Sequence, residues 1–168
     1  MSQLGVVILL WLQPLHLTGS ALSYSELNGT AARHAEEQRL QGMIDALRIE
    51  LKILEQVTVT VVDRNPLVMS VETRGGRSGP FTVLADEQFV ESLNDDELKA
   101  AIAHELGHVW IYTHHPYVQT EQLANEIALR VISREMLEPV YEKVWKRTGI
   151  RGNSAEYLMA SPSQRRQQ

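Results

Sequence analysis

Cysteine is absent from this chain of 168 residues. Its absence excludes disulfide bonds, cysteine nucleophiles, thiolate zinc sites and acylation of a lipoprotein cysteine. The protein must therefore be held together by its apolar core, and a metal bound by other side chains would stabilise it further.

Positive charge is also scarce, because 16 Lys and Arg stand against 21 Asp and Glu and no sustained basic stripe occurs. The formal net charge of -5 offers no footprint for nucleic acid, which we exclude as a partner. Gly75-Gly76 lacks the spacing of a phosphate-binding loop, so nucleotide binding is excluded too. The 43% apolar and 22% charged residues are typical of a globular chain. At this length we expect one domain with one core.

No charged side chain occurs among the first 23 residues. Leu4 to Leu12 form an uninterrupted apolar run, small residues follow, and Ala21-Leu22-Ser23 fits a small-x-small cleavage site. The run is too short for a helix across a bilayer of about 30 Å, which needs about 20 apolar residues, so no permanent membrane span is predicted. We expect residues 1–23 to be a signal peptide of a secreted or periplasmic protein. The alternative is a buried N-terminal strand of a cytosolic protein.

Hydrophobic periodicity predicts helices and strands over the rest of the chain. Residues 26–56 carry apolar side chains at three- and four-residue intervals, which indicates an amphipathic helix. Alternation then predicts a strand over Val57 to Val62. Two further strands are predicted over Leu67 to Glu72 and Phe81 to Leu84, with a glycine-rich loop between them. A short helix is expected over Asp86 to Leu93.

A well-capped helix should begin at about Asp95. Asn94 is a favourable N-cap residue, acidic residues occupy the first turn, and Glu97 stands where a capping box requires it. The residues that form the core stripe of this helix are Leu98, Ile102, Leu106 and Val109. A further periodic run over residues 118–149 predicts a long helix that Pro139 should kink or divide.

The most informative residues of the chain lie inside the capped helix and read His104-Glu105-Leu106-Gly107-His108. Two imidazoles four residues apart project from one helix face and can bind a single Zn²⁺ through neutral nitrogens. Glu105 can reach a water on that metal as general base. Gly107 costs a helix about 1 kcal/mol relative to alanine, which favours a close packing contact at this position.

A catalytic zinc takes three protein ligands and keeps a fourth position for water. Glu121 is the favoured third ligand, because Asn125 lies on the same helix face four residues later and could orient a ligand. His114 is an alternative at the metzincin spacing, although Ile111 replaces the glycine of that motif. Glu126 is another alternative and lies on a different face of its helix from Glu121.

Residues 93–109 resemble the active-site helix of the gluzincin metallopeptidases, especially the family that contains the CAAX prenyl endopeptidases and bacterial membrane-stress proteases. Glu121 to Asn125 is similar to the downstream ExxAD element of that family, whose Glu is the third zinc ligand. Asn125 replaces the Asp, and the transmembrane helices of the best-known members are missing from the printed sequence. The compact, soluble minigluzincins are the nearest analogy in size.

The resemblance implies an α+β, zincin-like fold, with a small mixed or antiparallel sheet of about three strands packed against an active-site helix and further long helices. It also implies that Phe81 to Leu84 form the sheet edge on which an extended peptide substrate lies. We expect a single metallopeptidase domain over residues 24–160 and a flexible tail over residues 161–168.

The leading hypothesis is therefore a zinc-dependent endopeptidase that acts on a peptide or protein substrate. His104, His108 and Glu121 would hold Zn²⁺, Glu105 would be the general base, and Asn125 would support a ligand. The candidates for a donor to the oxyanion are Tyr112, His115, Tyr117 and Tyr141.

A noncatalytic zinc-stabilised module that binds a protein partner is the main alternative, and a helical adaptor without metal is a third. An intact Glu105 favours the enzyme, because zinc binding alone needs no base at that position.

Overall fold

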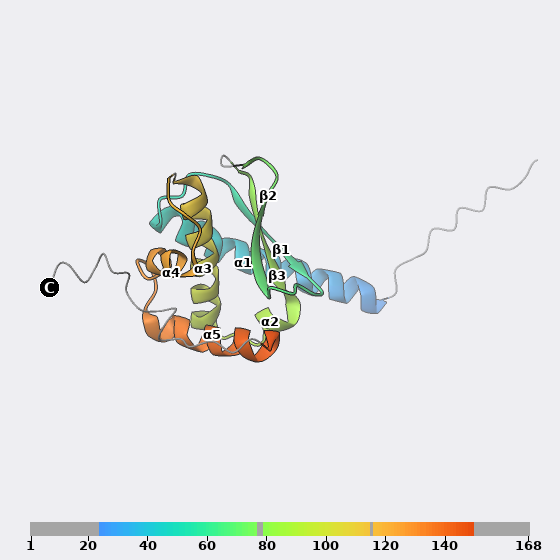
Figure 1. Cartoon of the computed structure of the whole chain (residues 1–168). Helices are drawn as coiled ribbons and strands as arrows, with labels where there is room; N and C mark the ends of the chain where they lie inside the picture. Colours follow the sequence, from blue (N-terminus) through green and yellow to red (C-terminus); the bar gives the residue numbers. More distant parts are fainter. Residues whose placement is uncertain (1–23, 77–78, 115, 150–168) are drawn as a thin grey trace, which may run out of the picture.

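The structure is a computed structural model that describes residues 24–76, 79–114 and 116–149 (Figure 1). The expected signal peptide over residues 1–23 and the expected tail over residues 161–168 lie outside the described residues. Three strands and five helices are described, in the mixed α+β arrangement that the sequence predicts. No helix within the described part of the chain combines the length and the apolar character that a membrane span requires.

The sheet has three strands in the order β1-β3-β2. Strand β1 (Val57–Val62) pairs in parallel with β3 (Phe81–Asp86), and β2 (Met69–Thr73) pairs with β3 in the antiparallel sense. The expectation that Phe81 to Leu84 form a sheet edge is wrong, because these residues belong to the central strand. Both hydrogen-bonding sides of β3 are occupied, and β2 forms the edge instead.

Helix α1 (Tyr24–Glu50) covers the other edge of the sheet, which belongs to β1. The backbone N–H of Val61 donates to Glu37 Oε1 at 2.9 Å, and that of Val59 donates to Gln41 Oε1 at 3.2 Å. Gln41 Nε2 in turn donates to the carbonyl of Val57 at 2.9 Å. Side chains of α1 therefore form hydrogen bonds with the backbone groups of β1 that a further strand would need for pairing.

Helix α3 (Asp95–Thr113) begins where the sequence predicts. Its capping box is present, because Asn94 Oδ1 accepts from the N–H of Glu97 at 3.0 Å and Glu97 Oε2 accepts from the N–H of Asn94 at 2.8 Å. The predicted core stripe is fully buried and consists of Leu98, Ile102, Leu106 and Val109. This stripe anchors α3 against the core and leaves its neighbouring face free for the histidines.

The C-terminal helical run is divided into α4 (Glu121–Ala128) and α5 (Arg134–Thr148). The sequence predicts that Pro139 kinks or divides this run, and a division at Pro139 is wrong, because the break lies at residues 129–133 and Pro139 lies inside α5. The break contains the β-branched pair Val131-Ile132, whose side chains lose rotamer freedom in a helix. A separate α4 can then cross α3 independently of α5.

Asp86 connects the end of the sheet to α5 and to the short helix α2 (Glu87–Glu91). Its carboxylate accepts from the N–H of Asn65 at 3.0 Å, from the N–H of Phe89 at 2.9 Å and from Arg147 Nη2 at 2.6 Å. Burial raises the pKa of Asp86, but these donors outweigh burial and hold the pKa below its ordinary value. The carboxylate therefore stays charged at neutral pH and fixes α5 over the end of the sheet.

Candidate metal centre

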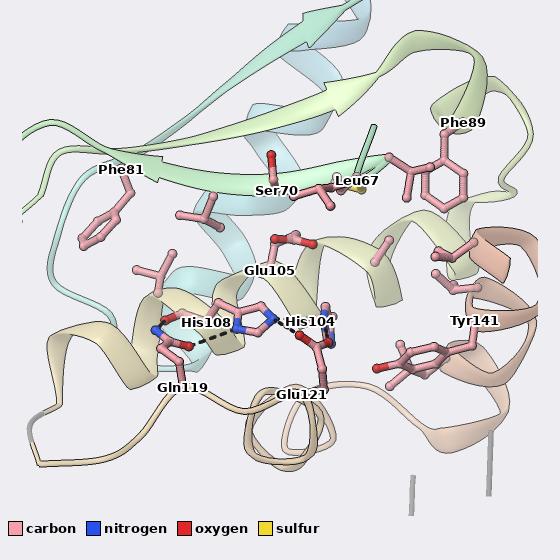
Figure 2. A pocket seen from close by; sticks show the side chains of 18 of the residues that line it. Leu67, Ser70, Phe81, Phe89, His104, Glu105, His108, Gln119, Glu121 and Tyr141 are labelled. Carbon is pink, nitrogen blue, oxygen red and sulfur yellow. Dashed lines mark hydrogen bonds and ion pairs between the residues drawn. The ribbon is translucent and has the colours of Figure 1, made fainter. Parts of the chain in front are cut away.

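Helices α3 and α4 bring His104, His108 and Glu121 together, as the sequence predicts (Figure 2). One ligand atom of each residue lies within 4.8 Å of those of the other two. Glu121 Oε2 lies 3.2 Å from His104 Nε2, and Glu121 Oε1 lies 3.5 Å from His108 Nε2. The two Nε2 atoms are 3.2 Å apart. Three donor atoms therefore converge on one point.

Gly107 explains how closely α4 approaches α3. A Cβ atom at this position would lie 2.4 Å from the carbonyl oxygen of Ala124. Ala124 is itself fully buried and lies one helical turn after Glu121. The packing role that the sequence suggests for Gly107 is confirmed, since a larger residue would push α4 away together with Glu121.

The two alternative third ligands do not belong to this cluster, which is the one potential metal site found among the described residues. His114 is the C-cap residue of α3 and stacks on Trp110, with 3.9 Å between the ring centroids. Its Nδ1 lies 2.8 Å from the carbonyl oxygen of Trp110. Glu126 is one residue beyond Asn125, on a different face of α4, as expected.

Amide side chains contact both histidines on the side away from the cluster. Asn125 Oδ1 lies 2.8 Å from His104 Nδ1 and also accepts from the hydroxyl of Tyr141 at 2.9 Å. Asn125 therefore stands where the sequence predicts. Gln119 Oε1 lies 3.0 Å from His108 Nδ1. Sequence reasoning missed Gln119, which lies in a nonhelical segment where no periodicity shows which way a side chain points.

The electrostatics of the cluster favour a cation. Hydrogen bonds with His104 and His108 hold the pKa of Glu121 well below its ordinary range. Burial alone would lower the pKa of His108, but the hydrogen bond with Glu121 and the charge of Glu105 raise it to about 9. The two carboxyl groups therefore stabilise positive charge at the place where the two Nε2 atoms meet.

Glu105 is 8% exposed and belongs to the same helix as the two histidines. Burial raises the pKa of its carboxyl group, although the neighbouring histidines His104 and His108 oppose this rise. Its side chain lines the same cleft as the histidines, and Figure 2 shows it directed into the space between α3 and the sheet. This is the position in which the sequence predicts a base.

The cluster opens into a cleft of about 500 Å³. One wall is β2 with the residues before it, and the opposite side is formed by α3 and α5 (Figure 2). Apolar side chains dominate the end near α5; they include Phe89, Ala101, Leu137, Val140 and Val144.

Two of the four candidate oxyanion donors, Tyr112 and Tyr141, line the cleft. Tyr117 packs on Trp110 at 5.5 Å between ring centroids and is not among the lining residues. His115 lies outside the described residues.

An α+β domain in which an HExxH helix and a glutamate of the next helix meet at a cleft has the architecture of a gluzincin metallopeptidase. The chain belongs to peptidase family M48, whose model matches residues 34–167. The resemblance drawn from the motifs is thereby confirmed.

Two curated relatives are protease HtpX homologs of Bacteroides fragilis. The protein of strain ATCC 25285 is 22% identical over 152 residues, and that of strain YCH46 is 21% identical over 152 residues. Each comparison covers 90% of this chain and 46% of the relative, so the chain spans about half the length of these relatives. No solved structure matches the chain significantly.

Proposed function

We propose that this chain is a zinc-dependent endopeptidase, in which His104, His108 and Glu121 hold the metal and Glu105 is the general base. The observation that carries the proposal is the convergence of three ligand atoms within 4.8 Å, beside a buried carboxyl group at a cleft. Membership of peptidase family M48 and similarity to proteins named as proteases support hydrolysis of peptide bonds.

The donor set fits zinc. Two imidazole nitrogens and one carboxylate oxygen form a ligand set found in catalytic zinc sites, whereas Mg²⁺ and Ca²⁺ prefer oxygen ligands alone. Three protein ligands would leave a fourth position on the metal for water, and the cleft would give access to it. When bound, zinc supplies the Lewis acidity that makes a water nucleophilic near pH 7 and polarises a scissile carbonyl.

Glu105 carries out the proton transfers in this proposal. Its carboxylate accepts a proton from the attacking water and delivers that proton to the nitrogen of the leaving amine as the C–N bond breaks. No covalent intermediate with the protein is required.

Strand β2 is the proposed edge for the substrate backbone, in place of Phe81 to Leu84. The carbonyl of Val68 accepts from the N–H of Asp86 at 2.8 Å. In an antiparallel strand the backbone groups of every second residue face the same neighbour, so those of Ser70 and Glu72 also face β3. Val71 and Thr73 then direct their backbone groups outward. An extended peptide could pair there as an added strand.

The apolar end of the cleft is proposed to accept a large apolar side chain of the substrate. Phe89 of α2 and Val140 and Val144 of α5 line the cleft there. Burial of an apolar side chain stabilises binding by about 25 cal/mol per Å² of apolar surface removed from water.

Export to the periplasm or the medium is a separate proposal, which rests on the sequence of residues 1–23 alone.

The proposed function is tested by incubating the zinc-loaded protein with a peptide library and identifying new termini by mass spectrometry. We expect internal cleavage beside large apolar residues, loss of cleavage after chelation, and recovery with one equivalent of zinc.

Val144→Trp should narrow the pocket and shift the preference toward smaller residues, whereas Glu142→Trp, an exposed position on the same helix, should not. A fully zinc-loaded protein that cleaves no peptide would favour the noncatalytic module instead.

A further inference from the structure

Gln119 makes two hydrogen bonds to a single residue, His108 (Figure 2). Its Nε2 donates to the backbone carbonyl of His108 at 2.9 Å, and its Oε1 lies 3.0 Å from Nδ1 of the same residue. Gln119 thus contacts both the main chain and the ring of His108, from the segment that leads into α4.

These two contacts require that Nδ1 of His108 carries a hydrogen. A backbone carbonyl can only accept, so the NH₂ end of Gln119 must face it and the Oε1 end must face the ring. An amide oxygen can also only accept, so Nδ1 must carry the hydrogen. Nε2, which faces Glu121 at 3.5 Å, is therefore the nitrogen that would offer its lone pair to a metal, once its own proton has left.

His104 is supported in the same chemical manner. Asn125 Oδ1 accepts at 2.8 Å from His104 Nδ1 and at 2.9 Å from the hydroxyl of Tyr141. Both histidines are therefore backed by an uncharged amide oxygen. A carboxylate in either place would also orient the ring, but it would add negative charge and raise the basicity of the ligand.

We propose that Gln119 is a positioning residue of the metal centre, and that Gln119 and Asn125 form a pair of neutral supports. The inference rests on the proposed zinc-binding role of His108. Each amide selects the tautomer that presents Nε2 to the metal without adding charge behind the ring. With zinc bound, the centre would keep the net charge of +1 that Zn²⁺ and one carboxylate give, and this charge would preserve the Lewis acidity that the metal supplies.

The proposal is tested with Gln119→Leu and Gln119→Glu, and with Gln122→Leu as a matched control on the exposed face of α4. Zinc dissociation constants are measured by competition with a chromogenic chelator. Gln119→Leu should bind zinc about 10- to 100-fold more weakly, as is typical when an outer hydrogen-bond partner of a ligand is lost. Gln122→Leu should bind zinc like the wild type, and Gln119→Leu with wild-type affinity would overturn the positioning role.

Gln119→Glu tests the effect of a negative charge behind His108 separately from the effect of ring orientation. It keeps an acceptor for His108 Nδ1 but loses the donor to the backbone carbonyl of His108, so it should bind zinc more tightly than Gln119→Leu does. The acidic limb of its kcat/KM profile should move to higher pH than in the wild type. If the pH profile of kcat/KM were the same as in the wild type, the absence of charge on Gln119 would have no role.

Nitrogen-15 NMR of His108 in the unsubstituted zinc-loaded protein is independent of how the variants fold. It should show hydrogen on Nδ1, and hydrogen on Nε2 would contradict the inference. A wild-type protein that binds no zinc would instead refute the proposed function itself.

Discussion

Glu105→Gln should reduce kcat/KM for peptide cleavage by about 10²- to 10⁴-fold, the range that general base catalysis contributes. Glutamine has nearly the same size and fills the same buried position, but its amide cannot take a proton from water. Because Glu105 lies outside the cluster of three ligand atoms, the variant should still bind one zinc. Steady-state kinetics and metal analysis of the same preparation measure both quantities.

The matched control is Glu138→Gln, which makes the same chemical change at an exposed position of α5. It should retain the activity and the zinc content of the wild type. If Glu105→Gln cleaved peptide at a rate within a few-fold of the wild type, Glu105 would not be the base. If the variant lost its zinc, the residue would contribute to binding rather than to proton transfer.

Gly107→Ala should destabilise the protein and weaken zinc binding together. Its Cβ would lie 2.4 Å from the carbonyl oxygen of Ala124, and this obstacle is backbone, so α4 itself has to move. Such overpacking costs about 1–3 kcal/mol, and a backbone obstacle places the cost in the upper part of this range, above the roughly 1 kcal/mol that alanine gains over glycine in helix propensity. Movement of α4 carries Glu121 away from the histidines, so zinc affinity should fall by at least about tenfold, or about 1.4 kcal/mol.

Gly42→Ala is the control for this substitution. Gly42 is an exposed residue within α1, and a Cβ there would meet no atom within 4 Å. The same change should therefore stabilise the protein by about 0.5–1 kcal/mol and leave zinc affinity unchanged. Urea unfolding of the metal-free proteins and chelator competition distinguish the two variants. A Gly107→Ala protein as stable as the wild type, with full zinc affinity, would show that the contact between α3 and α4 does not hold the centre together.

The features that the sequence predicts well depend on neighbouring residues. The two residues of the capping box, Asn94 and Glu97, are three positions apart, and the two histidines of the motif are one helical turn apart. Glu121 and Asn125 could be chosen together for the same reason, because both lie on one face of a single short helix. In each case local helix geometry places the side chains.

Features that depend on contacts between distant parts of the chain could not be predicted from the sequence. The central position of β3 follows from its pairing with β1 on one side and β2 on the other, and an alternating strand pattern does not specify its neighbours. His114 could not be eliminated by spacing, since its exclusion depends on where α3 ends and on the stacking with Trp110. Gln119 gave no signal, because its partner His108 lies 11 residues earlier and is reached only through the turn into α4.

The central claim is that two histidines and Glu121 hold one zinc whose remaining position faces the cleft. A crystal structure of the zinc-loaded protein, with anomalous diffraction recorded at the zinc edge, tests this claim most directly. We predict one zinc bound by Nε2 of His104, Nε2 of His108 and the carboxylate of Glu121, with a solvent molecule completing the shell. A fourth protein ligand in place of solvent, or a zinc bound without Glu121, would contradict the account.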